Sequence, residues 1–163
     1  MDKEEFSKEK FDATFDMAKS HLKLETERVA HLDSKLNFIL VFLAGLIAGL
    51  NIIFPLTEDP KKQIASIVLL IEFFCMVFSS GIMVLIGMYP KQNALIDADN
   101  FCDVDLHSKP YDEFMGRYIA TLKDSIKSYQ RTNAKKATCM KVSFILSIIA
   151  FVLLGILLLL KTL

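Results

Sequence analysis

Three long apolar stretches constrain this chain more than any other feature of its sequence. They run from Leu36 to Pro55, from Ile64 to Met88 and from Val142 to Leu160. A helix needs about 20 mostly apolar residues to cross the ~30 Å hydrocarbon core of a bilayer. Because lipid offers the backbone no hydrogen-bond partner, isolated spans of this length are expected to be helices. The sequence therefore predicts an all-α membrane protein with three transmembrane helices.

Lysine and arginine are distributed unevenly around these stretches, and this predicts an orientation. Both residues are frequent before the first span and between the second and third spans, whereas the turn between the first two spans carries Lys61 and Lys62 alone. Short segments rich in Lys and Arg stay in the cytoplasm. We therefore expect a cytoplasmic N-terminus and a turn and C-terminal end outside the cytoplasm.

Both polar segments have the residue spacing of amphipathic helices, with steps of four and three that form one stripe along a helix. In the first segment the stripe comprises Phe11, Phe15, Ala18, Leu22, Glu25, Val29, Leu32 and Leu36. In the second, after Pro110 in a first helical turn, it comprises Tyr111, Met115, Tyr118, Leu122, Ile126 and Tyr129. Two such helices in one compartment bury their stripes by packing together. We expect a cytoplasmic helical lobe formed by an N-terminal helix and a helix preceding the third span, each continuing unbroken into a span.

The predicted boundaries follow from these patterns. They are a cytoplasmic amphipathic helix at 1–35, transmembrane helix 1 at 36–55, a periplasmic turn at 56–63, transmembrane helix 2 at 64–88, a cytoplasmic loop and helix at 89–140, and transmembrane helix 3 at 141–161.

The loop before Pro110 is acidic, which raises the question of a metal site. Its acidic residues are Asp97, Asp99, Asp103 and Asp105. Their spacing fails the calcium-loop pattern, because Phe101 and Cys102 stand at the fifth and sixth positions. Cys102 and His107 supply two of the four ligands that a structural zinc ion requires. We expect a solvated acidic loop and no metal.

Other functional classes are disfavoured as well. The sequence has no nucleophile-elbow motif and no glycine-rich phosphate loop, so we do not expect an enzyme. A formal net charge of zero argues against nucleic-acid binding. Cys75, Cys102 and Cys139 are too few and too scattered for a disulfide framework, and we expect free thiols.

Small residues within the spans indicate close helix contacts. Gly45 and Gly49 have the small-xxx-small spacing that lets two helix backbones approach, and Ser79, Ser80 and Gly81 form a similar patch in the second span. These patches serve either packing within the chain or contact between copies, with Gly45, Gly49, Ser80 and Gly81 as candidate contact points.

Glu72 is the one carboxylate within an apolar stretch. An ionisable residue in a span is a functional hypothesis by default. The alternative is a structural hydrogen bond to a neighbouring helix, for which Asn51 is a candidate partner.

The residues entering the first span resemble a known family. The run Glu27-Arg28-Val29-Ala30-His31-Leu32-Asp33-Ser34-Lys35 is similar to the Arg, then Asp-x-Lys, signature of the transmembrane effectors of Pycsar antiphage systems. Tyr89-Pro90 after the second span, and the polar segment that returns through Lys135 and Lys136, resemble the rest of that layout. The resemblance covers nearly the whole chain.

The resemblance implies a function that composition alone does not. In such a system a partner pyrimidine nucleotide cyclase makes cCMP or cUMP during infection, and the effector binds it and damages the bacterial inner membrane, causing abortive infection. It implies a multi-pass inner-membrane protein that forms a homo-oligomer on activation. The competing predictions are an accessory helical subunit of a membrane complex and a holin-like toxin without a nucleotide ligand.

A cyclic nucleotide requires a cation for its phosphate, a polar partner for its ribose and an apolar or aromatic face for its base. The candidate contacts are Arg28, Asp33, Lys35, Arg117, Tyr118 and Lys123. The first set, Arg28, Asp33 and Lys35, carries the family resemblance. In the plainer interpretation, Arg28 pairs with a nearby carboxylate and the tyrosines fill the helical stripe.

Overall fold

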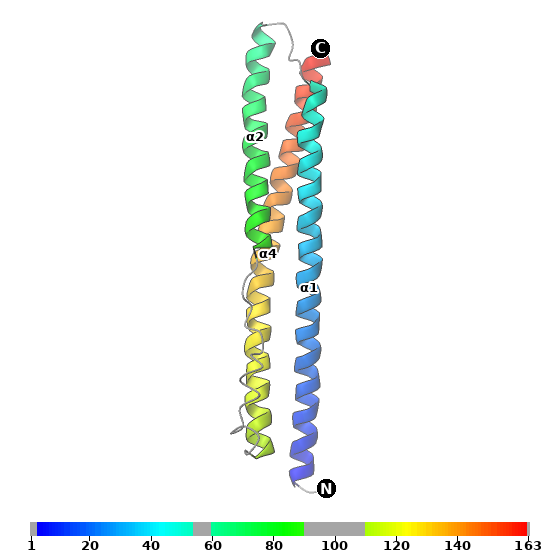
Figure 1. The fold of residues 1–163 in the computed structure, drawn as a ribbon, viewed down its shortest axis with the longest axis vertical. Helices are drawn as coiled ribbons and strands as arrows, with labels where there is room; N and C mark the ends of the chain where they lie inside the picture. Colours follow the sequence, from blue (N-terminus) through cyan, green and yellow to red (C-terminus); the bar gives the residue numbers. More distant parts are fainter. Residues whose placement is uncertain (1–2, 54–59, 90–109, 163) are drawn as a thin grey trace. The chain divides into compact units, whose positions relative to one another are not determined.

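The computed structural model describes residues 3–53, 60–89 and 110–162, with side chains from Lys8 to Leu50, from Gln63 to Tyr89 and from Pro110 to Thr162. These residues form three helices, α1 (Lys3–Ile53), α2 (Pro60–Met88) and α4 (Tyr111–Thr162) (Figure 1). Each of the three is long and apolar enough to cross a membrane. The prediction of an all-α chain with three membrane-spanning helices is confirmed to that extent.

Helices α1 and α4 contain 51 and 52 residues, so each is far longer than a single span. As predicted, each polar segment continues into an apolar one without a break. In α1 this follows from the absence of Pro and Gly from the helix before Gly45. The acidic loop, with Cys102 and His107, lies outside the described residues.

Two helix starts differ from the predicted ones, and proline explains both. Pro110 lies just before α4, where its carbonyl accepts hydrogen bonds from the backbone N–H groups of Glu113 and Phe114 at 3.0 and 3.1 Å. Helix α2 begins at Pro60, so residues 60–63 of the expected turn are helical. A proline suits a first helical position because its missing N–H would have no helical partner there.

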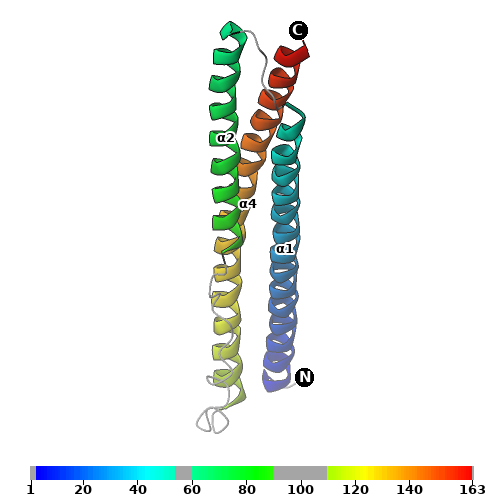
Figure 2. The ribbon, with the colours of Figure 1, turned by 45° about the horizontal axis from the view of Figure 1, so that its top comes forward.

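The chain divides into two compact units. The two-helix unit comprises the described parts of Met1–His31 and Pro90–Ala134, and therefore the first parts of α1 and α4. The three-helix unit comprises the described parts of Leu32–Tyr89 and Lys135–Leu163, and therefore α2 with the remainders of α1 and α4. In both views α1 and α4 run beside each other within each unit (Figure 1, Figure 2).

In the two-helix unit, the predicted stripe of α1 faces α4. The stripe residues from Phe11 to Val29 are half-buried, and the residues between them are exposed. On α4, Met115 and Leu122 are buried as predicted, whereas Tyr111 is exposed. Polar residues that the apolar pattern did not include also occupy the buried face of α4. They are Ser125, Thr132 and Asn133.

Specific polar and aromatic contacts join the two helices of this unit. The Asn133 amide donates hydrogen bonds to the Glu25 carbonyl at 3.1 Å and to Glu25 Oε2 at 2.6 Å. The Phe15 and Tyr118 rings lie 5.1 Å apart. Tyr111 is exposed because its hydroxyl reaches outward to donate to Asp12 Oδ1 at 2.7 Å. These pairs show that α1 and α4 run in parallel, since later residues of one meet later residues of the other.

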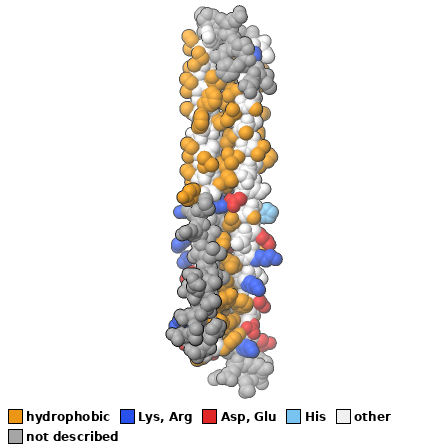
Figure 3. All heavy atoms as spheres, viewed as in Figure 1, with side chains coloured by type: hydrophobic (Ala, Val, Ile, Leu, Met, Phe, Trp, Pro, Cys, Tyr) orange, Lys and Arg blue, Asp and Glu red, His pale blue; other side chains and the backbone are white. Residues whose placement is uncertain are grey.

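The three-helix unit has an apolar core built from all three helices. Helix α1 contributes Leu36, Ile39, Leu43, Leu46 and Leu50, α2 contributes Phe73, Val77 and Val84, and α4 contributes Ala150, Leu154 and Leu157. The outer surfaces of these helices are apolar too, with Phe38 and Phe78 70% and 67% exposed. Figure 3 shows hydrophobic side chains gathered over this unit. A surface of this kind is suited to contact with lipid.

Three serines connect α2 to α4 inside this core. Ser80, Ser143 and Ser147 are almost fully buried, and the Ser143 hydroxyl donates to the Ser80 carbonyl at 3.1 Å. The Ser80 and Ser147 hydroxyl oxygens lie 3.0 Å apart. Of the two interpretations of the small patch in α2, packing within the chain is therefore the one observed for Ser80. The proposed role of Ser80 as a contact point between copies is corrected, because its side chain is enclosed by its own chain.

The glycines also differ in their surroundings. A Cβ atom at Gly45 or Gly81 would meet nothing within 4 Å, and one at Gly49 would make an ordinary 3.4 Å contact with Leu154 Cδ2. A Cβ at Gly87 would lie only 3.1 Å from the Cys139 Cβ and 3.1 Å from Leu36 Cδ1. Gly87, which the sequence spacing did not single out, is thus the glycine that requires a close helix approach.

Candidate functional site

A groove of about 300 Å³ lies between α1 and α4 in the three-helix unit, where the apolar stretch of α1 begins. It is lined by Lys35, Phe38 and Ile39 from α1 and by Met140, Lys141 and Phe144 from α4. On each helix the lining residues are three or four positions apart or adjacent, which places them on one face. The parallel course of the two helices brings the two faces together.

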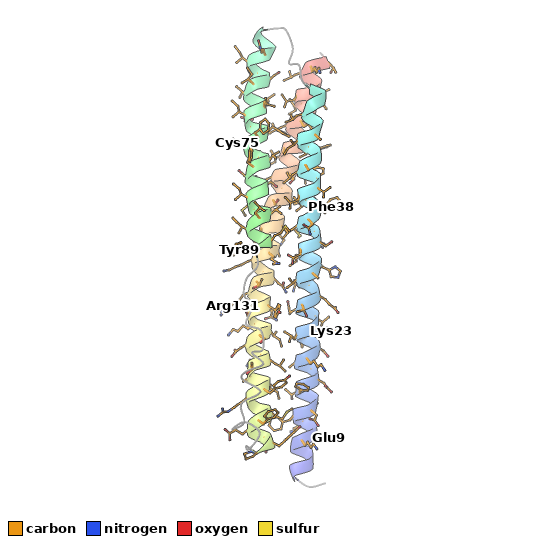
Figure 4. All side chains as sticks on the ribbon, viewed as in Figure 1. Glu9, Lys23, Phe38, Cys75, Tyr89 and Arg131 are labelled. Atoms are coloured by element: carbon orange, nitrogen blue, oxygen red, sulfur yellow. The ribbon has the colours of Figure 1, made fainter. Side chains whose placement is uncertain are left out.

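The groove has apolar walls, to which each helix contributes one lysine and one phenylalanine. Lys35 and Lys141 are exposed and stand at the polar end of their apolar stretches, where long lysine side chains extend toward water along apolar surface. Phe38, labelled in Figure 4, and Phe144 are 70% and 54% exposed, so part of each ring is available to a ligand. Ile39 is buried and forms part of the floor.

The residues that line the groove indicate which class of ligand it could bind. The described residues that line the groove include two lysines and no carboxylate, but the surface of the groove itself is almost wholly apolar, so both lysines line it with their aliphatic stems. Aromatic or aliphatic walls bind a flat or apolar body. The groove surface itself therefore suits an apolar or aromatic ligand.

Asp33, one of the signature residues, has a structural partner next to the groove. The Lys136 Nζ atom donates to Asp33 Oδ1 at 2.5 Å, and the two side chains are 10% and 38% exposed. Since Lys136 lies on α4 and Asp33 on α1, this ion pair joins the two helices that form the groove. Lys35, which lines the groove, lies two positions further along α1.

The remaining predicted contacts lie in the two-helix unit. Arg28 is exposed, with Nη1 3.9 Å from Glu25 Oε1, and Arg117 Nη2 lies 3.1 Å from Glu113 Oε1. These contacts agree with the plainer interpretation, in which the arginines pair with nearby carboxylates. Lys123 is exposed on α4.

Tyr118 likewise fills the helical stripe, as the plainer interpretation expected. Its ring lies 5.1 Å from Phe15 and 6.4 Å from Phe114. Glu25, one turn before Arg28, meets Asn133, which lies about 22 Å along α4 from Tyr118 at 1.5 Å per residue. Within one copy, Arg28 and Tyr118 therefore do not share a small-molecule site.

Sequence reasoning missed Lys136, Met140, Lys141 and Phe144 as neighbours of the signature. A signal for Lys136 was present, because it continues the spacing of Tyr129 and Thr132 along α4. It was passed over because lysine is rarely expected on a buried face. Lys35 and Lys141 line the same groove because of the register between α1 and α4. The spacing of residues along a single helix gives no information about that register.

Two further predictions concern metals and thiols. Within residues 3–53, 60–89 and 110–162, no group of three or more His, Cys, Asp or Glu side chains could hold a metal ion. Cys75 and Cys139 are free thiols. His21 and His31 are both exposed on α1.

Comparisons of the chain with protein-family models, with curated proteins and with solved structures find no match.

Proposed function

We propose that this protein is a membrane effector of the Pycsar type, which binds cCMP or cUMP made by a partner cyclase and then impairs the integrity of the bacterial inner membrane. The observation that carries the proposal is the position of Lys35. This signature residue lines an apolar groove with two phenylalanines that suits the base of a cyclic pyrimidine nucleotide, and in the proposal the ammonium groups of Lys35 and Lys141 bind the phosphate beside it.

The proposal includes an orientation, which rests on the distribution of Lys and Arg. A cytoplasmic N-terminus puts the polar end of the first span, and with it the groove, on the side where a cytoplasmic second messenger arrives. The two-helix unit is then the cytoplasmic helical lobe. The three-helix unit is the membrane part on which the ligand acts.

In this proposal the ligand binds where two helices meet. The phosphate lies between the Lys35 and Lys141 ammonium groups, and the base lies against Phe38 or Phe144. A ligand changes a conformational equilibrium only if it binds one arrangement better than the other. A bound phosphate neutralises the repulsion between two lysines and so favours the arrangement in which α1 and α4 hold them close together. Membrane damage then follows from assembly of several activated copies.

The test is equilibrium binding of radiolabelled cCMP and cUMP to the detergent-solubilised chain. We expect selective binding of one nucleotide, weakened about ten- to a hundredfold by Lys35→Ala and by Lys141→Ala, because each removes a charged hydrogen bond of roughly 1.5–3 kcal/mol. The matched control is Lys19→Ala, which removes an exposed lysine of α1 far from the groove.

The possible results separate the competing functions. Unchanged binding in both groove variants, with loss in Arg28→Ala or Arg117→Ala, would keep the effector function and move the site to the two-helix unit. Absence of binding to either nucleotide would contradict the proposal and favour an accessory membrane subunit or a holin-like toxin. A cyclase gene beside the gene for this chain would favour the effector, and a transporter operon the accessory subunit.

A further inference from the structure

The outward surface of α2 carries two different stripes of side chains. The first, which we call the Glu72 seam, has steps of three and four and consists entirely of exposed residues: Ala65, Val68, Glu72, Cys75, Ser79, Ile82 and Ile86. The second stripe is large and apolar and consists of Ile64, Ile67, Ile71, Phe78 and Leu85. The second stripe is the surface expected of a helix that faces lipid. The Glu72 seam is not, because half of it is small or polar.

Glu72 is the residue that most clearly distinguishes the Glu72 seam from the apolar stripe. It lies near the middle of α2, and it is the one exposed carboxylate of this helix between Gln63 and Tyr89. Helix α2 packs on the core through Phe73, Val77 and Val84, and Glu72 lies outside that face. Ionisable residues inside a membrane face a protein interior or a polar partner, because hydrocarbon does not solvate them. Among the side chains that the structure describes, Glu72 has no hydrogen-bond or ion-pair partner, and Asn51, the candidate partner, lies outside those side chains.

We propose that the Glu72 seam is the surface through which α2 binds α2 of a second copy, with Glu72 of one copy beside Glu72 of the other. Copies inserted by the same charge rule have the same orientation in the bilayer, so a two-fold axis between them is perpendicular to the membrane. Around such an axis each residue meets its own equivalent at the same depth. The two helices are then parallel.

The chemistry of the seam is self-complementary. Two carboxyl groups that share a proton hydrogen-bond to each other, so Glu72 needs no residue of another kind. Ala65, Cys75 and Ser79 are small and let the helix backbones approach, as the interfaces of membrane helices require. A repeat of three and four keeps the same seam facing a parallel partner along its length. A span of a different protein would instead need a cationic or hydrogen-bonding side chain of its own at the depth of Glu72.

This inference does not depend on a nucleotide ligand. The contact surface is a property of α2, whereas the proposed nucleotide groove lies between α1 and α4. Of the earlier candidates for contact between copies, Ser80 is enclosed within its own chain, and Gly45, Gly49 and Gly81 stay predictions. Failure of nucleotide binding would therefore leave the seam untouched, and the reverse also holds.

Cys75 provides a direct test, because it is a free, exposed thiol one turn from Glu72 on the same seam (Figure 4). In the Cys102→Ser, Cys139→Ala background Cys75 is the remaining cysteine. Mild oxidation of intact membranes without nucleotide should give a reducible covalent dimer through Cys75. The matched control adds Cys75→Ser and Phe78→Cys, which moves the thiol by one turn onto the lipid-facing stripe. We expect loss of the dimer in this control and its return when Ser79→Cys replaces Phe78→Cys.

Substitutions of Glu72 test the carboxyl contact itself. Glu72→Gln keeps a donor and an acceptor and should preserve the Cys75 dimer, whereas Glu72→Leu should abolish it while leaving the helix content unchanged, since the residue is outside the core. Equal yields of covalent dimer through Cys75 and through Phe78→Cys would mean that copies collide at random in the membrane, and this would overturn the proposal. Full cross-linking in Glu72→Leu, or a Cys75 adduct to another protein in place of the dimer, would also overturn it.

Discussion

At the scale of single residues, we expect the ion pair between Asp33 and Lys136 to contribute to the stability of the fold, because the Lys136 side chain is only 10% exposed. Removing the charge of Asp33 leaves the nearly buried Lys136 ammonium without its partner. Breaking a fully buried pair costs about 3–5 kcal/mol, and water screens Asp33, which is 38% exposed. We therefore expect Asp33→Asn to destabilise the protein by roughly 1–3 kcal/mol. The measurement is denaturant-induced loss of helix signal in detergent.

The double variant Asp33→Asn, Lys136→Met separates the ion pair from other effects of either substitution. It should be more stable than Asp33→Asn alone, because no unpaired buried ammonium remains. Lys135→Met is the matched control, since Lys135 is exposed. Equal stability of Asp33→Asn and the unaltered chain would show that the ion pair contributes nothing.

The Tyr111 hydroxyl gives a prediction about pH. Its hydrogen bond to Asp12, with smaller effects from desolvation and from the charges of Asp12 and Asp112, raises the pKa of Tyr111 above its usual value of 10.0. Because the pKa of Tyr111 is higher in the folded than in the unfolded state, this contact stabilises the fold below about pH 10 and its contribution is lost as the pH rises through the raised value.

A tyrosinate absorbance titration checks the shift, with Tyr111→Phe identifying the signal of this residue. Asp12→Asn should lower the pKa of Tyr111 toward 10.0, and Asp16→Asn should not, because Asp16 is an exposed carboxylate one turn further along α1. An unchanged titration in Asp12→Asn would show that the hydrogen bond is not made in solution.

At the scale of helices, Gly87 is the described glycine at which α2 leaves least room for a side chain. A methyl group there would meet the Cys139 Cβ atom at 3.1 Å, and this atom cannot rotate away. We expect Gly87→Ala to destabilise the three-helix unit by about 1–3 kcal/mol, as overpacking does. Gly45→Ala and Gly81→Ala, where the added methyl meets nothing within 4 Å, should have no such effect.

Thermal unfolding of the three glycine variants in detergent compares them directly. Adding Cys139→Gly to Gly87→Ala removes the contacting atom and should recover part of the stability, whereas adding Cys139→Ala should not. Loss of stability in Gly45→Ala to the same extent would place the tight contact elsewhere.

At the scale of the whole molecule, the orientation in the membrane is a testable proposal. Three spans put the two ends of the described chain on opposite sides. Because Lys and Arg are frequent before the first span and in the polar part of α4, we expect the N-terminal end inside. Alkaline phosphatase, which is active outside the cytoplasm, should be active when fused after Leu163 and inactive when fused before Met1. The opposite result would show that the N-terminal end lies outside the cytoplasm. The groove would then be on the side that a cytoplasmic ligand does not reach.

The sequence by itself determined the positions of the helices and the residues on their packing faces. The stripe from Phe11 to Leu36 and the three apolar stretches are local patterns, and helix formation and membrane insertion respond to local hydrophobicity and to the 3.6-residue repeat. The choice of Lys35 as a site residue rests on the family resemblance and on its place at the entrance to the first span, and it stays a prediction.

Only the tertiary structure decided which polar residues meet. The pairing of Asp33 with Lys136, the contact of Ser80 with Ser143, the close approach at Gly87 and the exposure of Glu72 all depend on the rotation and register of one helix against another. Many contacts along each helix set these two quantities together, because side chains pack densely and a shift at one contact displaces the others. A repeat along a single helix shows which face is buried, and the partner helix decides what that face touches.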